Sequence, residues 1–315
     1  MGSTSSENDA FRDLLKSKWD ISELGPVKYA LGISVERDHS SRTISLSQNT
    51  FIDRIINRFN QTDARPCDTP MVAGLRIQRP DKGVPVSPEI AEWRARTPYR
   101  ELVGSLNYVA VATRPDISFA VGRLSTVLDC FTPDHWSAAI RVLRYLKGTR
   151  TLCLTLGGQN PLALMGWSDS DWANCQETSR SIGGFCFTLG SGMISWSSRR
   201  QQVVADSTCY AEYIALHDAC NEALFLRELL SGLHIDTCAP TPIHCDNDAA
   251  LRLAQDQVWH SRVKHIRVKF HKVHEHVENG DTKILCINSA SNTVDILTKP
   301  LGRVDFLRLR HYLGL

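Results

Sequence analysis

Two acidic residues stand one residue apart in the stretch GWSDSDWANC, residues 166–175, behind a short apolar segment. These are Asp169 and Asp171. Side chains alternate between the two faces of an extended strand, so both carboxylates would lie on the same side. Like charges on one face repel each other unless a cation or water lies between them. The pair therefore fits either the rim of a metal site or a polar strand end, and the rest of the chain has to decide between them.

Three further acids stand where strands are expected to end or helices to begin. They are Glu212 in a long helical segment, Asp246 in PIHCDN and Asp295 in NTVDILTK. Mixed α/β sheets tend to form sites where strand ends converge. Carboxylates without a His or Cys pattern suit Mg²⁺ or Mn²⁺, and two such ions could hold a phosphate and activate a water. Taken singly, however, each acid is more simply a helix cap or a solvated charge.

The elements that must position these acids follow a turn at residues 157–161, GGQNP, where we place a domain boundary between 1–156 and 157–315. Beyond it the apolar patterns predict strands at 162–169, 182–189, 193–200, 242–246 and 283–287 and helices at 207–232, 247–256, 264–279 and 292–300. This order predicts an α/β fold with a mixed five-stranded sheet and helices on its faces.

The first region, 1–156, reads as mixed α and β structure. The patterns predict helices at 11–19, 49–60, within 99–128 and at 133–149, and strands at 27–38 and 42–48. The proline-bearing stretch 61–97 is expected to be a long loop, and Arg114-Pro115 is expected to break the helical segment 99–128.

Composition limits the class of protein. The 315 residues carry a formal net charge of +2 and 42% hydrophobic residues, which is typical of a globular protein and gives no bulk sign of nucleic-acid binding. The ten cysteines include no CxxC pair, which argues against a zinc knuckle and favours reduced thiols. Because no apolar run approaches about 20 residues, we expect no membrane partner. We expect an intracellular location, in the cytoplasm, with the nucleus as the alternative.

The motifs taken in order carry a specific resemblance. GWSDSDWA, SIGGFCFTLGSGMISWSSRRQQVVADSTCYAEYIAL, HCDN, VWHSRVKHI and VDILTKPL together closely resemble the ribonuclease H domain of copia-type LTR retrotransposons. LGPVKYALGISVERD, CDTPM and YRELVGSLNYVAVATRPDISFAVGRLS resemble the end of the reverse transcriptase palm, the thumb and the connection of the same polyprotein. The resemblance implies a ribonuclease H-like domain at 157–315, preceded at 1–156 by a truncated α+β reverse transcriptase region.

The resemblance also implies roles for the acids. Asp169, Glu212, Asp246 and Asp295 match an Asp-Glu-Asp-Asp site that would hold two Mg²⁺ ions, with Mn²⁺ as an alternative, and would cut the RNA strand of an RNA–DNA hybrid. Asp171 would then lie beside the ligands or in solvent, although strand alternation alone leaves both acids open. The family's Tyr-x-Asp-Asp polymerase turn is missing from this sequence, so we expect no polymerase core and take the remaining polyprotein or reverse transcriptase segments as further partners.

Two basic stretches are candidates for contact with the hybrid's phosphates, WHSRVKHIRVKFHKVHEH at 259–276 and SSRRQQ at 197–202. The residues singled out are Arg199, Arg200, Arg262, Lys264, His265 and Lys269. A solvated helix face and an exposed turn are the alternative interpretations of the same stretches.

Two functions from different classes remain open. One is a metal-dependent endonuclease, and the other is a catalytically inactive nucleic-acid-binding remnant of a retroelement. A transposase-like nuclease of the same fold is less favoured, because such sites usually use three acids. The complete set of four acids favours the nuclease.

Overall fold

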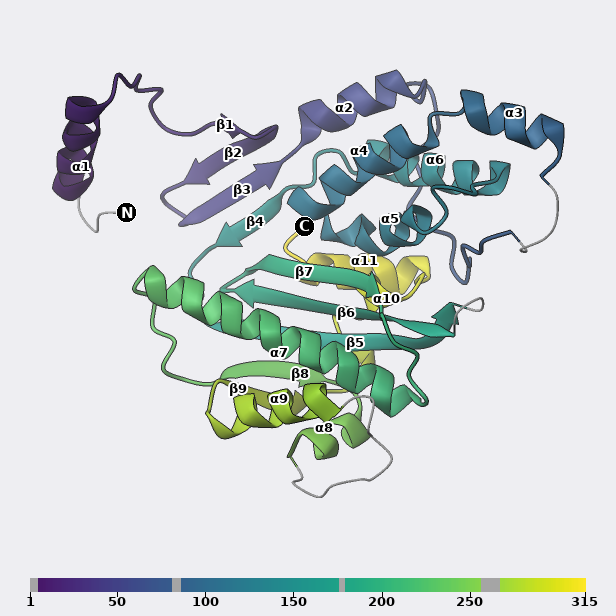
Figure 1. Ribbon diagram of the computed structural model, residues 1–315. Coiled ribbons are helices and arrows are strands. Elements are labelled where there is room, and N and C mark those ends of the chain that lie inside the picture. Colours follow the sequence, from purple (N-terminus) through teal and green to yellow (C-terminus); the bar gives the residue numbers. More distant parts are fainter. Residues whose placement is uncertain (1–4, 81–85, 176–178, 256–266) are drawn as a thin grey trace.

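The computed structural model describes residues 5–80, 86–175, 179–255 and 267–315 (Figure 1). It contains two sheets, one with strand order β1-β2-β3-β4 and one with strand order β7-β6-β5-β8-β9. In the described part of the chain, no helix has both the length and the apolar character needed to cross a bilayer.

The first sheet is antiparallel throughout and is accompanied by a group of helices. Its strands are β1 (Tyr29–Ala30), β2 (Ile33–Asp38), β3 (Thr43–Ser47) and β4 (Leu154–Gly157). The helices are α1 (Ser5–Lys18), α2 (Asn49–Arg58), α3 (Pro88–Arg96), α4 (Tyr99–Ala112), η1 (Pro115–Ile117), α5 (Ser118–Ser125) and α6 (Pro133–Gly148). The expected break falls between α4 and α5, because proline cannot continue the first helix. Helix α3 lies inside the stretch expected to be a loop, and it begins where Ser87 caps it and Pro88 takes its first turn.

The second sheet is mixed, as predicted. Its strands are β5 (Leu164–Cys175), β6 (Arg180–Leu189), β7 (Gly192–Arg200), β8 (Thr241–Cys245) and β9 (Thr282–Cys286). The pairs β5–β6 and β6–β7 are antiparallel, whereas β5–β8 and β8–β9 are parallel. The helices are α7 (Thr208–Gly232), α8 (Asp248–Gln255), α9 (Arg267–Glu278), η2 (Ser289–Ser291), α10 (Asp295–Thr298) and α11 (Arg303–Tyr312). The α/β fold class predicted from the sequence is thereby confirmed.

Two of the sequence-based boundaries were wrong in ways that matter for the site. Strand β5 continues to Cys175, so Asp169 lies inside the strand and does not end it. The helix expected at 292–300 is reduced to α10, because the Asn292 side chain accepts a hydrogen bond from the Val294 backbone N–H at 3.2 Å and holds the chain in a turn before the helix.

Helix α11, which the sequence patterns did not predict, joins the two regions. In Figure 1 it lies between the helices of the first region and the five-stranded sheet. Its Phe306 packs edge-on against Tyr145 of α6, with ring centroids 5.5 Å apart. One buried apolar cluster contains residues of α4–α6 together with Cys186 of β6 and Met193 of β7. The division at residues 157–161 into two domains stays a prediction, and the apolar core continues across it.

A buried ion pair of the first region lies beside this junction. Arg114 Nη2 lies 2.7 Å from Asp116 Oδ2, and both side chains are almost fully excluded from solvent. The hydroxyl of Tyr145 donates a hydrogen bond to the same carboxylate and accepts one from Arg310 Nη1 of α11 at 3.2 Å. The two buried charges pair with each other within the first region, and Arg310 joins α11 to this network through the Tyr145 hydroxyl.

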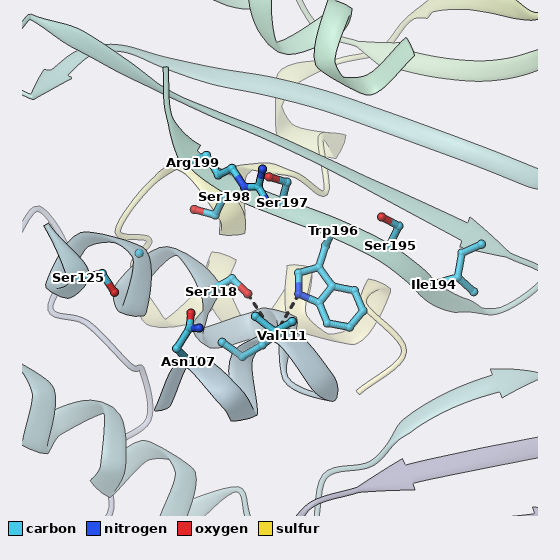
Figure 2. Close-up of a pocket in the computed structure, with 12 residues that line it drawn as sticks. Asn107, Val111, Ser118, Ser125, Ile194, Ser195, Trp196, Ser197, Ser198 and Arg199 are labelled. Atoms are coloured by element: carbon cyan, nitrogen blue, oxygen red, sulfur yellow. Dashed lines mark hydrogen bonds between the residues drawn. The ribbon is translucent and has the colours of Figure 1, made fainter. Parts of the chain in front are cut away.

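Strand β7 packs against the helices of the first region (Figure 2). The indole N–H of Trp196 donates to the carbonyl of Ala110 at the end of α4, at 3.0 Å. A Cβ added to Gly122 of α5 would lie 3.4 Å from the carbonyl oxygen of Ser198, so helix and strand approach closely. A cavity of about 510 Å³ lies between these elements. The contact of helix and strand therefore couples the first region to an edge of the five-stranded sheet.

Candidate active site

The site forms where strands β5 and β8 separate. The two strands pair over two residues each, near the start of β5. Beyond this point side chains satisfy the β5 backbone: Asn292 Nδ2 donates to the Ser168 carbonyl at 3.1 Å, and the Ser170 N–H donates to Glu212 Oε1 at 3.2 Å. Buried backbone groups need such partners. The opening between the strands therefore fixes Glu212 of α7 beside β5.

Asp169 and Asp295 both contact the side chain of the same lysine, Lys299. Asp169 is 1% exposed and accepts a hydrogen bond from the Thr298 hydroxyl. Lys299 Nζ lies 3.4 Å from both carboxylate oxygens of Asp169 and 2.6 Å from Asp295 Oδ1. Helix α10 thus brings one acid and one ammonium group to the acid in the middle of β5.

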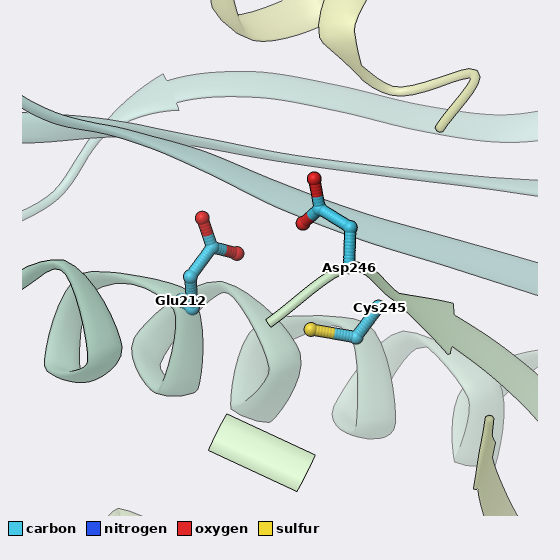
Figure 3. A group of neighbouring side chains, drawn as sticks. All are labelled: Glu212, Cys245 and Asp246. Carbon is cyan, nitrogen blue, oxygen red and sulfur yellow. The ribbon is translucent and has the colours of Figure 1, made fainter. Parts of the chain in front are cut away.

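Glu212 and Asp246 form the other side of the cluster, together with Cys245 (Figure 3). One carboxylate oxygen of each acid and the Cys245 sulfur all lie within 4.8 Å of one another. Within the described structure, Glu212 Oε2 is buried and has no hydrogen-bond partner. Sequence reasoning did not single out Cys245, and burial raises the pKa of its thiol to about 12. It therefore stays protonated and is a poor ligand for a hard cation.

Burial and mutual repulsion dominate the electrostatics of the acids. Burial raises the pKa of Asp169 to about 7, with Lys299 opposing the shift and Asp295 and Asp246 adding to it. Burial also raises the pKa of Glu212 to about 9, and the charges of Asp169 and Asp246 act in the same direction. The four acids therefore act on one another as a single cluster of negative charge, which Lys299 offsets in part.

This cluster fits a divalent metal. It offers carboxylate oxygens from four separate elements, one of them buried without a partner, and a concentration of like charge that a cation would relieve. Burial lowers the pKa of Lys299, but the charges of Asp169 and Asp295 outweigh it and raise the pKa above its usual value. The lysine therefore stays charged among the acids.

A glycine opposite Asp169 allows α10 to approach the sheet. Asp169 pairs with Gly184 of β6, and a Cβ at that glycine would lie 2.9 Å from both Val294 and Thr298. Any larger residue would push α10 away from the strand. Asp171, two residues farther along β5, is half-buried. The contacts with α10 therefore form at Asp169, and its choice over Asp171 as the metal ligand stays a prediction.

The structure brings some of the predicted phosphate contacts together. Arg199 and Arg200 are exposed at the end of β7, and Lys269 of α9 lies 3.4 Å from Asp218 Oδ1 of α7. All three line a cleft of about 460 Å³ between β6, β7 and α7. The remaining three, Arg262, Lys264 and His265, lie outside the described residues.

We expect the metal-free protein to lose stability as the pH rises from about 4 to about 9. A carboxyl whose folded pKa lies above its unfolded pKa contributes stability that is full below the unfolded value, near 4, and is lost as the pH rises through the folded value. Folded values of about 7 for Asp169 and about 9 for Glu212 place this loss between about pH 4 and 9. For each group, every pKa unit between the unfolded and the folded value corresponds to about 1.4 kcal/mol of unfolding free energy.

Urea unfolding in EDTA at several pH values measures this loss. Replacing Asp169 by asparagine removes one of the two groups, so the variant should lose less stability than the wild type over the same range. An equal pH dependence in the two proteins would contradict the expectation.

Comparison with known proteins identifies relatives of this chain. The family described as reverse transcriptase (RNA-dependent DNA polymerase) matches residues 1–73. The retrovirus-related Pol polyprotein from transposon TNT 1-94 of Nicotiana tabacum is 38% identical over 96% of this chain, which covers 22% of that protein. The Pol polyprotein from transposon RE2 of Arabidopsis thaliana is 35% identical over 96% of this chain, which covers 20% of it. The chain thus spans about a fifth of the length of these relatives.

Among solved structures, an RNase H1 isolated from compost aligns with 44% of this chain and 93% of its own, at 18% identity and a TM-score of 0.34. The sequence relatives match nearly the whole chain. The chain belongs to the copia-type retrotransposon Pol polyprotein family.

Proposed function

We propose that this chain is a metal-dependent endonuclease that cuts the RNA strand of RNA–DNA hybrids. The observation that carries the proposal is the convergence of Asp169, Glu212, Asp246 and Asp295 where β5 and β8 separate. Bringing four acids from separate parts of the chain into one partly buried cluster destabilises the fold, because buried like charges repel each other. A role in holding metal explains why the cluster exists.

The acids would hold two Mg²⁺ or Mn²⁺ ions, which when bound supply an activated water and stabilise the leaving oxygen. Asp169 would be one of the residues that hold them, because the charges of Lys299, Asp295 and Asp246 all act on its carboxylate. Glu212 and Asp246 would complete the ligands on the α7 side, and Asp295 on the α10 side. Lys299 offsets part of the negative charge on Asp169 and Asp295.

The protein's remaining contribution is to orient the hybrid. Arg199, Arg200 and Lys269 line one cleft and would contact backbone phosphates. The RNA strand would be chosen through its 2′-hydroxyl groups, which DNA lacks. The intracellular location and the remaining polyprotein segments as partners stay predictions.

A hybrid labelled separately on each strand tests the proposal. With Mg²⁺ we expect the purified chain to cut the RNA strand and leave the DNA strand intact, and with EDTA we expect no cutting. Double-stranded DNA of the same sequence is the control and should survive. Binding of the hybrid without any cleavage in Mg²⁺ or Mn²⁺ would replace the proposal with the inactive remnant.

A further inference from the structure

Another cavity, lined by basic residues, lies in the first region, and none of the four acids lines it. Its volume is about 730 Å³, and it is lined by the segment of residues 72–80 and by helix α6. Four arginines line it and only one carboxylate does: Arg76, Arg79, Arg141, Arg144 and Asp134. The cavity therefore has a local excess of positive charge that the nearly neutral chain as a whole does not show.

Three of the four arginines have no acidic partner among the described residues. Arg141 Nη2 donates to the Thr69 hydroxyl at 3.0 Å, while its Nε is buried and unpartnered. Arg144 Nε donates to a backbone carbonyl at 2.6 Å, and Arg76 is exposed. By contrast, Arg79 is paired with Asp129. A guanidinium group that donates only to neutral oxygens keeps its full charge available to an anion.

The cavity is joined to the candidate active site by one loop. The backbone N–H of Gly74, in the segment that lines the cavity, donates to the Pro300 carbonyl at 3.3 Å. Pro300 directly follows Lys299, which contacts Asp169 and Asp295. An ion pair at 2.9 Å between Arg303 and Asp68 holds the same loop to α11. The segment that lines the cavity is therefore held next to the residue that follows Lys299 of the candidate site.

We propose that this cavity binds phosphate groups of a nucleic-acid backbone. Planar guanidinium groups match two oxygens of a phosphate at once, and three arginines without acidic partners among the described residues line this cavity. The inference rests on the proposed function in taking the hybrid as the ligand. The same chemistry would also accept free inorganic phosphate, and the experiment separates the two sources.

The test compares the full chain with two variants of equal charge, Arg76→Gln in the cavity and Arg54→Gln outside it. Arg54 is exposed on α2 and has no ion-pair partner in the described structure, so it is a matched control. Binding of a labelled hybrid is measured by anisotropy in EDTA at several salt concentrations, so turnover is not needed. We expect Arg76→Gln to bind about three- to tenfold more weakly at low salt, with a slope of log affinity against log salt shallower by about 0.9.

Equal affinities and slopes for Arg76→Gln and Arg54→Gln would overturn the inference. In a second experiment inorganic phosphate is titrated into the complex of protein and hybrid. Weak competition by phosphate in the wild type, and none in Arg76→Gln, would support the inference. Phosphate binding that depends on Arg76 while hybrid binding does not would assign the cavity to free phosphate and overturn the backbone proposal. If the chain binds the hybrid as expected but does not cut it in Mg²⁺, the proposed nuclease function is contradicted and the proposed phosphate-binding cavity is not.

Discussion

Replacing Asp169 by asparagine should lower Mg²⁺-dependent cleavage of the RNA strand by at least about a hundredfold, because loss of one preorganised charged group at a reacting centre commonly has an effect of this size. Asparagine has nearly the same shape, so Thr298 can still donate its hydrogen bond and the strand stays in place. The variant should also bind Mn²⁺ more weakly in calorimetric titrations without substrate. Cleavage rates and metal affinity together separate a lost ligand from a lost fold.

Asp171→Asn is the matched control. The same chemical change, two residues along the same strand, falls on a half-buried side chain outside the contacts with α10. We expect its cleavage rate and Mn²⁺ affinity to stay within about threefold of the wild type, as for other substitutions away from a site. Rapid cleavage by Asp169→Asn combined with its loss in Asp171→Asn would transfer the ligand role to Asp171.

Replacing Phe306 by alanine should lower the free energy of unfolding by about 3–5 kcal/mol and reduce cleavage as well. Phe306 is 4% exposed and packs on Tyr145, so its removal leaves a cavity between α11 and the first region. Helix α10, which carries Asp295, is connected to α11 by four residues. Loosening α11 should therefore displace an acid of the site. Urea unfolding and cleavage assays on the full chain measure the two effects.

Val304→Ala serves for comparison on the same helix. Its side chain is 78% exposed, and we expect stability to change by no more than about 0.5 kcal/mol. If Phe306→Ala unfolds at the same urea concentration as Val304→Ala, the packing of α11 on the first region is not needed for stability. If it is destabilised but cuts the hybrid at the wild-type rate while folded, α11 does not position Asp295.

Local patterns in the sequence were sufficient for the order of the strands and α-helices from β5 to α10. Apolar alternation and helical spacing depend on neighbours within a few residues, so β6, β7 and α7 lie within about three residues of their predicted limits. The same patterns missed α11, whose exposed residues obscure its apolar face. They also overextended the helix at 292–300, because Asn292 bonds to a strand 124 residues away.

Residue types made these acids candidates for a site of hard metal ions, and the resemblance of the surrounding motifs to copia-type ribonuclease H domains selected the set of four. Only the tertiary structure decided that they meet. The contact between Thr298 and Asp169 joins residues 129 positions apart, and it exists because Gly184 lets α10 reach the sheet. Lys299, whose charge offsets the cluster, carried no signal of its own in the sequence. Long-range packing and desolvation set the pKa values and the positions of these groups, and no local pattern encodes either.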